Sequence, residues 1–169
     1  NKGNKLNHAV GLGAMNLHGF LATHHIYYAS EEAVDFVDMF FYAMAYHAFK
    51  ASSELAQTEG AFAGFADSEY ADGTYFKKYT EHKIAPATPR IAKLLADCHF
   101  ELPSQQDWQE LVKDIRAHGL ANSHLMAVAP TGSISYLSSC TPSLQPVVSP
   151  VETRKEGKVG RVYVPAYKI

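Results

Sequence analysis

The sequence lacks most of the features that would place it outside ordinary globular proteins. It contains only two cysteines among 169 residues, Cys98 and Cys140, with no CxxC spacing, so reduced thiols are expected rather than a disulfide framework. No apolar run approaches the roughly 18–20 residues of a membrane helix, and the polar N-terminus leads into no apolar signal core. These absences predict a cytoplasmic protein without a membrane partner.

A dominant charge of one sign is also missing. The 15 Lys and Arg residues nearly balance the 17 Asp and Glu residues, so the net charge of −2 gives no reason to expect nucleic acid as a partner. Charged residues make up only 19% of the chain, below the roughly 25% of an average soluble domain. We therefore expect that part of the surface is normally covered by other protein.

The length suits one ordinary domain, and a hydrophobic fraction of 47% is enough for a core. The first residue is not Met, and the last residues carry no helix stop or polar tail, so both ends are consistent with cuts in a longer chain. No internal repeat or low-complexity linker divides the sequence. The expectation is one domain, mostly helical, with a few strands.

The clearest helix signal covers residues 30–58. Ser30 is a good N-cap, two acids follow it in the first turn, apolar residues recur at helical spacing, and Gly60 closes the segment. A shorter apolar pattern predicts a second helix over residues 90–99. Cys98 lies late in this segment on its apolar face, and we therefore predict that Cys98 belongs to the core.

The second half of the chain changes from helix signals to strand signals. Ser104 and Asp107 have the spacing of a capping box, and Gly119 ends the helix that follows them. The short apolar run at 125–129 predicts a buried strand. Alternation over residues 151–164 predicts a β-hairpin.

The stretch most informative for function directly follows the predicted strand, at residues 130–135. Gly132 permits close approach of the backbone to a ligand. The hydroxyls of Thr131, Ser133 and Ser135 can donate hydrogen bonds. If a helix begins at Ser133, its free N–H groups converge on one spot and favour a phosphate. The pattern is not a Walker A loop, because GxxxxGK[ST] is absent, and a tight strand-to-helix turn without a ligand is the alternative interpretation.

The nine histidines form no metal-binding pattern, since there is neither an HExxH motif nor a Cys/His cluster. We interpret them as structural or surface residues, and no metal site is predicted. Cys140 lies shortly after Ser135 in a Ser-rich loop. It would be a reactive thiol only if it faced a phosphate pocket, and no paired base is visible in the sequence around it.

Several motifs along the chain together resemble one known family. They are GLGAMNLHG at residues 11–19, the pair Tyr27-Tyr28, AFAGF at 61–65, APTGSISY at 129–136, TPSLQP at 141–146 and VETRKEGKVGRVY at 151–163. Their order and spacing are similar to the large (α) subunit of aerobic class I ribonucleotide reductases, most closely the bacterial class Ib type. The resemblance covers essentially the whole chain, so residues 1–169 are expected to be a fragment of the catalytic barrel domain.

The resemblance implies an α/β fold in which this fragment, mostly helical with a few strands and a C-terminal β-hairpin, is part of a ten-stranded barrel. It also implies reduction of ribonucleoside diphosphates to deoxyribonucleoside diphosphates by a thiyl radical on a finger-loop cysteine. In this family a Pro-Thr-Gly-Ser-Ile motif holds the substrate's diphosphate at a helix N-terminus. That role falls here on Pro130, Thr131, Gly132, Ser133 and Ile134.

The same resemblance implies that the catalytic machinery lies outside residues 1–169. The finger-loop cysteine, the allosteric site, the radical-relay tyrosines and the Cys-containing tail would precede or follow this stretch. Neither Cys98 nor Cys140 falls at a catalytic position of the family, and Tyr27-Tyr28 is not the relay pair. We therefore expect no catalytic residue, metal or cofactor in this chain, and no activity from it alone.

For the intact enzyme, the resemblance implies several partners. They are a small subunit whose dimetal centre generates the radical, a dithiol reductant of thioredoxin or glutaredoxin type, nucleotide effectors, and a second copy of the large subunit. The alternative is a separately folded, non-catalytic helical module that binds a phosphorylated ligand or a protein partner.

Overall fold

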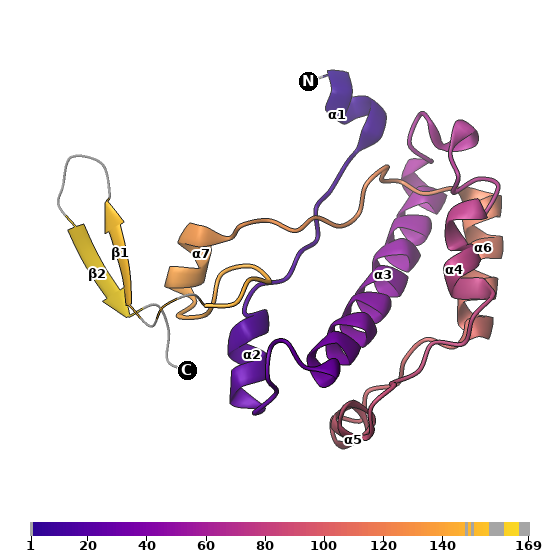
Figure 1. Cartoon of the computed structure of the whole chain (residues 1–169). Coiled ribbons are helices and arrows are strands. Elements are labelled where there is room, and N and C mark those ends of the chain that lie inside the picture. The colour runs from indigo at the N-terminus through magenta and orange to yellow at the C-terminus, as the bar shows by residue number, and fades with distance from the viewer. Residues whose placement is uncertain (1, 148, 150, 156–160, 166–169) are drawn as a thin grey trace. The chain divides into compact units, whose positions relative to one another are not determined.

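The chain divides into two compact units (Figure 1). The computed structural model describes residues 2–147, 149, 151–155 and 161–165. The first unit consists of Asn1–Leu12 with Val34–Ala127, and the second consists of Gly13–Ala33 with Val128–Ile169.

Helices make up most of the described chain. In order, the elements are α1 (Lys2–Asn7), α2 (Leu17–Thr23), α3 (Glu31–Glu59), the 3-10 helices η1 (Phe65–Asp67) and η2 (Thr74–Phe76), then α4 (Lys77–Thr80), α5 (Pro89–Asp97), α6 (Gln105–His118), α7 (Gly132–Leu137), and the strands β1 (Val151–Lys155) and β2 (Arg161–Pro165). None of the helices in the described ranges is long and apolar enough to cross a membrane.

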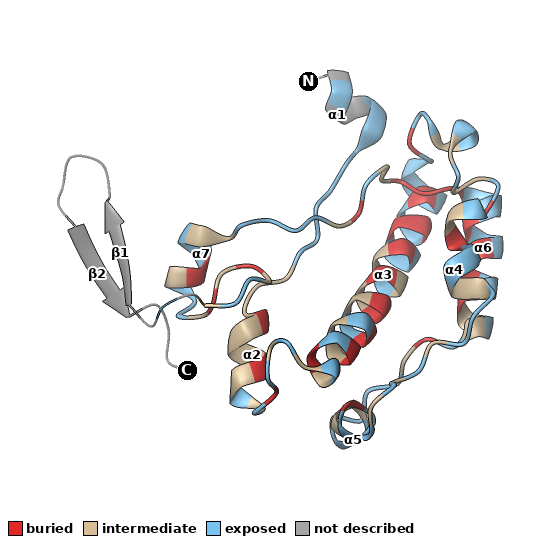
Figure 2. Cartoon of the chain, in the orientation of Figure 1, coloured by how far each residue is buried: buried red, intermediate tan, exposed pale blue. Residues whose placement is uncertain are grey.

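The long helix α3 begins and ends where the sequence predicts. The Ser30 hydroxyl accepts a hydrogen bond from the Ala33 N–H at 3.2 Å, and Glu31 and Glu32 lie in the first turn. Gly60 follows the last turn with φ +86°, a left-handed conformation that glycine adopts without strain. Buried positions recur along the helix (Figure 2).

The capping box of α6 is confirmed in both directions. The Asp107 N–H donates to the Ser104 hydroxyl at 3.1 Å, and the Ser104 N–H donates to the Asp107 carboxylate at 2.6 Å. Gly119 ends the helix with φ +84° in a buried position where a Cβ would overlap that of Ala61. The predicted helix at 90–99 is also confirmed as α5, with Thr88 as its N-cap.

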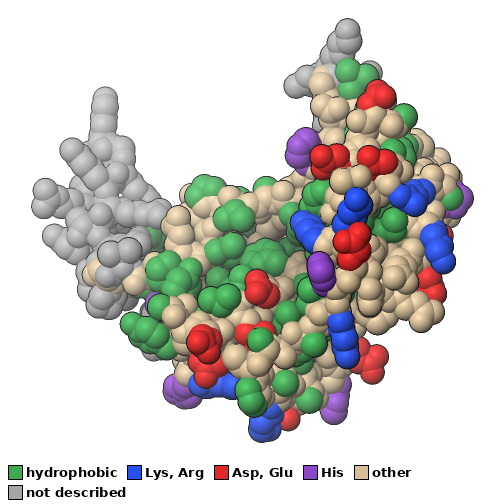
Figure 3. All heavy atoms as spheres, turned by 45° about the vertical axis from the view of Figure 1, so that its right-hand side comes forward, with side chains coloured by type: hydrophobic (Ala, Val, Ile, Leu, Met, Phe, Trp, Pro, Cys, Tyr) green, Lys and Arg blue, Asp and Glu red, His purple; other side chains and the backbone are tan. Residues whose placement is uncertain are grey.

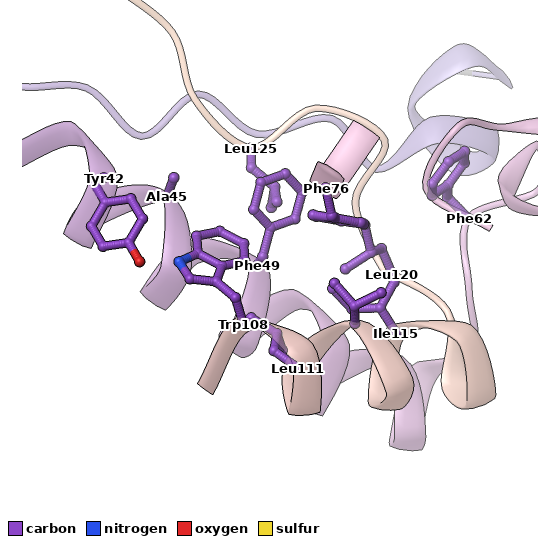
Figure 4. Close-up of a cluster of buried hydrophobic side chains, with 11 residues drawn as sticks. Tyr42, Ala45, Phe49, Phe62, Phe76, Trp108, Leu111, Ile115, Leu120 and Leu125 are labelled. Atoms are coloured by element: carbon purple, nitrogen blue, oxygen red, sulfur yellow. The ribbon is translucent and has the colours of Figure 1, made fainter. Parts of the chain in front are cut away.

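The core of the first unit is built around aromatic rings from α3, η2 and α6 (Figure 4), and Tyr79 of α4 packs against it. The Trp108 ring stacks on Tyr79 with centroids 4.0 Å apart, and Phe49 meets Phe76 edge-on at 5.0 Å. Trp108 and Phe76 are fully buried. Each large apolar side chain of this kind stabilises the fold by roughly 1.5–3 kcal/mol when buried, so this cluster is the main stabilising element of the unit.

A buried carboxylate joins α3 to the start of α5. Asp35 is 6% exposed and accepts three hydrogen bonds, from the Ala87 N–H at 2.9 Å, the Thr88 N–H at 2.8 Å and the Thr88 hydroxyl at 2.7 Å. Burial alone would raise the pKa of Asp35, but these three donors stabilise the carboxylate and lower its pKa below the usual value. No local sequence signal marked this contact.

Two predictions from local pattern are wrong. Residues 125–129 do not form a buried strand: Leu125 is buried and Met126 makes a single parallel bridge with Leu12, but Val128 is 70% exposed. A buried strand needs a neighbour on each side, and one neighbouring segment pairs with this run. Cys98 is an exposed free thiol rather than a core residue, because it lies just past the last turn of α5.

The C-terminal hairpin is confirmed in its backbone pairing. Strand β1 runs antiparallel to β2, with Val151 opposite Pro165 and Lys155 opposite Arg161. The turn that joins them, residues 156–160, lies outside the described residues. Within the described ranges this pair is the only sheet, so the part of the chain that the structure describes is mostly helical, as predicted, and a barrel is not seen in it.

Candidate phosphate-binding loop

The candidate loop at residues 130–134 leads directly into the short helix α7, which begins at Gly132. The Ser135 N–H donates to the Thr131 carbonyl at 3.1 Å, the first hydrogen bond of the helix. The N–H groups of Gly132, Ser133 and Ile134 precede that bond and therefore have no acceptor within the helix. The predicted helix start is confirmed, one residue earlier than expected.

The side chains of the loop differ in accessibility. Ser133 and Ile134 are exposed, whereas Thr131 and Gly132 are half-buried. Ser135, which the sequence offered as a third donor, is buried, and its hydroxyl donates to the Gly132 carbonyl at 2.9 Å. The hydroxyls accessible to a ligand are therefore those of Thr131 and Ser133.

Thr131 has an unusual backbone conformation for a β-branched residue. It precedes α7 at the N-cap position with φ +46° and ψ +28°, in the left-handed region. Its side chain does not cap the helix; instead its Oγ1 accepts a hydrogen bond of 2.6 Å from the Ser143 N–H. Because the oxygen is the acceptor in this bond, the hydroxyl hydrogen is left to point elsewhere.

The segment that follows α7 is fastened to α2, and sequence reasoning missed this connection. The Asn16 N–H donates to the Thr141 carbonyl at 2.9 Å, and the Thr141 N–H donates to the Asn16 side-chain oxygen at 3.1 Å. The Gly19 N–H donates to the Thr141 hydroxyl oxygen at 3.2 Å. Asn16, Gly19 and Thr141 lie inside two of the motifs quoted above, but nothing in the sequence pairs those motifs with each other.

Two further contacts hold the end of this segment. The Val147 N–H donates to His18 Nδ1 at 3.0 Å, and the Tyr28 hydroxyl donates to the Leu144 carbonyl at 2.7 Å. The rings of His18 and Tyr28 meet edge to face at 5.8 Å. His18 therefore has the structural role predicted for the histidines, with Nδ1 assigned as an acceptor from its hydrogen bond.

The sequence also drew attention to metal ligands and to the thiol of Cys140 near the loop. Among the residues that the structure describes, there is no group of three or more His, Cys, Asp or Glu side chains that could hold a metal ion. Cys140 is a free, half-buried cysteine whose backbone N–H donates to the Ser135 carbonyl at 3.0 Å, so it closes the C-terminal side of α7.

The described part of the chain is mostly helical and carries the polar loop 130–134 at the start of α7, and comparison with known proteins specifies the family. The whole chain, residues 1–169, matches the family described as ribonucleotide reductase, barrel domain. The chain therefore belongs to the ribonucleotide reductase barrel-domain family. This confirms the resemblance seen in the sequence motifs.

Its relatives are longer proteins of the same kind. The chain is 61% identical over 171 residues to the ribonucleoside-diphosphate reductase subunit alpha of Mycoplasma pneumoniae, covering 99% of this chain and 24% of that protein. It is 39% identical over 165 residues to the subunit of the same name from Bacillus subtilis, covering 97% of this chain and 23% of the relative. The chain thus spans about a quarter of the length of the curated relatives it matches.

Proposed function

We propose that this chain is part of the catalytic barrel of a ribonucleotide reductase large subunit, and that the complete subunit reduces ribonucleoside diphosphates to deoxyribonucleoside diphosphates in the cytoplasm. The observation that carries the proposal is the family match over residues 1–169 together with 61% identity to a ribonucleoside-diphosphate reductase subunit alpha. A non-catalytic binding module is less well supported, because the relatives bear a reductase name.

The part of the reaction assigned to this chain is binding of the substrate's diphosphate. The free N–H groups of Gly132, Ser133 and Ile134 are the donors that a phosphate accepts at a helix start. The hydroxyls of Thr131 and Ser133 add two donors beside them. Pro130 fixes the direction in which the chain enters the loop.

We propose that the barrel forms when the rest of the subunit adds strands to those of this chain. Residues 10–12 and 124–127 already pair in the parallel sense: the Leu12 N–H donates to the Leu125 carbonyl at 2.8 Å, and the Ala127 N–H donates to the Leu12 carbonyl at 3.0 Å. Parallel pairing is the kind that α/β barrels use, and it needs further strands beside it. We propose that the missing strands of a ten-stranded α/β barrel add to these segments.

Exposed apolar side chains support the same view (Figure 3). In the second unit Leu137 is 88% exposed, Val128 70% and Ile134 54%; in the first unit Leu12 is 50% exposed. Apolar surface of this kind is normally covered by protein. We propose that the remainder of the large subunit covers it, which also accounts for the low charged fraction of the chain.

The chemistry is proposed to come from elsewhere in the enzyme. A radical-generating small subunit with a dimetal centre, a thioredoxin- or glutaredoxin-like reductant, nucleotide effectors and a second large subunit complete the proposal. Cys98 is exposed at the end of α5 and Cys140 closes α7, and neither is assigned a catalytic role. The chain alone is expected to reduce no nucleotide; thiol-dependent reduction of CDP by the purified chain would contradict this.

The substitution Gly132→Val in the complete large subunit tests the loop. A glycine permits close approach of a ligand to the backbone and a branched side chain hinders it, so we expect the affinity for CDP to fall by roughly 10–100-fold, the loss of one or two charge-assisted hydrogen bonds. Gly64→Val is the matched control, because a Cβ at Gly64 meets only the Phe62 ring, at 3.6 Å. Equilibrium binding of CDP measures both variants. Unchanged affinity in Gly132→Val would contradict the proposal.

The gene sequence on either side of this chain distinguishes the two functions. A fragment of a reductase predicts an upstream cysteine with Asn and Glu beside it, and a Cys-containing tail downstream. Stop codons immediately on both sides would favour the binding module instead.

A further inference from the structure

We infer that Asn16 is a positioning residue for the proposed diphosphate loop: through Thr141 and Ser143 it holds Thr131 so that the Thr131 hydroxyl donates to the ligand. The inference rests on the proposed function of the loop. All four residues belong to the second unit, in which the segment after α7 passes beside the start of α2 (Figure 1).

Asn16 does not use its side chain in the way its position in α2 would predict. It occupies the N-cap, where an Asn side chain usually accepts a hydrogen bond from the first turn, yet it caps no N–H of α2. The side-chain oxygen instead accepts from the Thr141 N–H, while the Asn16 N–H donates to the Thr141 carbonyl. Asn16 makes these two hydrogen bonds with φ at +71°, a left-handed conformation that Asn tolerates better than most residues.

Thr141 is the fixed point between α2 and the loop. Thr141 is fully buried, and both its backbone N–H and its backbone carbonyl are hydrogen-bonded to Asn16. The Gly19 N–H donates to the Thr141 hydroxyl oxygen, so Asn16 and Gly19, at the two ends of the first turn of α2, both bind Thr141. Glycine fits at residue 19, because a Cβ there would overlap the Asn16 side-chain oxygen.

Thr141 is joined through Pro142 to Ser143, and Ser143 is hydrogen-bonded to Thr131. Ser143 is 2% exposed and has φ +50°, and its N–H donates to Thr131 Oγ1 at 2.6 Å. This bond occupies an oxygen lone pair, so the hydroxyl hydrogen is free for an acceptor outside the loop. A phosphate oxygen is such an acceptor, and the pair then forms a charge-assisted hydrogen bond.

The constraint matters because the loop conformation is strained. A β-branched residue at φ +46° is an outlier that persists only when its surroundings hold it. If Asn16 no longer held Thr141, Thr131 would relax toward an ordinary conformation and the Gly132 N–H would turn with it. Ligand binding would then have to restore the loop, which weakens affinity rather than the chemical step.

Two substitutions in the complete large subunit test the inference. Asn16→Gly keeps the left-handed backbone but removes the side-chain oxygen, and we expect the Kd and KM for CDP to rise about tenfold, with kcat within twofold of wild type. Asn16→Asp restores an oxygen acceptor for the Thr141 N–H, so it is expected to recover most of the affinity. CDP binding, steady-state kinetics and thermal unfolding are measured on each variant.

Ser104→Ala controls for simple destabilisation, because it weakens the cap of α6 in the first unit and should lower Tm without raising the KM for CDP. Unchanged KM in Asn16→Gly, or equal losses in Asn16→Gly and Asn16→Asp, would overturn the inference. The loop variant Gly132→Val separates the two proposals. If it weakens CDP binding while Asn16→Gly does not, the positioning role is wrong and the loop's function stands; if neither does, the proposed diphosphate-binding role of the loop is wrong.

Discussion

Asp35 gives the sharpest test of how the first unit is held together. Its carboxylate receives three donors from Ala87 and Thr88, and only 6% of the residue is exposed. Asp35→Ala leaves these donors without their acceptor. A hydrogen bond to a charged group contributes roughly 1.5–3 kcal/mol, but Ala87 is exposed and water can replace part of the loss. We therefore expect the free energy of unfolding to fall by about 3 kcal/mol.

The assay is urea unfolding followed by circular dichroism, with Asp38→Asn as the matched control on the same helix. Asp38 is exposed, so its substitution should change stability by less than about 0.5 kcal/mol. Asp35→Asn keeps one acceptor oxygen and should lose roughly 1–2 kcal/mol. A loss below about 1 kcal/mol in Asp35→Ala would refute the reasoning, since it would mean that the three hydrogen bonds contribute little beyond those made with water.

The pH dependence of stability provides a second measure of the same carboxylate. The folded pKa of Asp35 lies below its value in the unfolded chain, so the folded state binds this proton more weakly. The stabilisation is therefore complete above the unfolded pKa of about 3.9 and is lost as the pH falls through the folded pKa. Asp35→Asn should flatten this acid limb; an unchanged limb would show that other carboxylates produce it.

Two further predictions concern the first unit. Gly119→Ala should destabilise the chain by more than Gly60→Ala, although both glycines have φ near +85°. A Cβ at residue 119 would overlap Ala61, whereas a Cβ at residue 60 meets nothing within 4 Å. Equal urea midpoints for the two variants would contradict this. Burial raises the pKa of the phenols of Tyr42, Tyr46, Tyr70 and Tyr79, so a spectrophotometric titration should show them ionising above pH 10 and stability falling as the pH rises through that range. Identical titration curves for the folded and unfolded chain would rule this out.

The parts of the fold that sequence reasoning predicted are those with local signals. Ser30 and Ser104 each lie within a few residues of the N–H groups that they cap, so spacing alone identified both helix starts. The Gly60 and Gly119 ends follow from backbone conformation in the same way. The start of α7 was predicted for the same reason, because the polar stretch at 130–135 before a helix can be recognised without knowing its neighbours.

The parts that were missed depend on contacts between distant segments. Asp35 bonds to Thr88, and Asn16 bonds to Thr141, and no spacing rule links either pair. The apolar run at 125–129 was expected to be a buried strand because periodicity reports side-chain character but not the number of neighbouring strands. The family resemblance identified both sides of the Asn16–Thr141 contact as motifs, yet it did not show that they touch.

The aromatic core has one more consequence, which is spectroscopic. Trp108 is the single tryptophan of the chain and is surrounded by Tyr42, Tyr46 and Tyr79 with ring centroids 4.0–5.9 Å away. At these separations excitation absorbed by the tyrosines passes efficiently to the indole. Fluorescence excited through tyrosine but emitted by Trp108 therefore reports, without any label, whether α3, α4 and α6 are packed together, and its loss would mark the opening of this unit specifically.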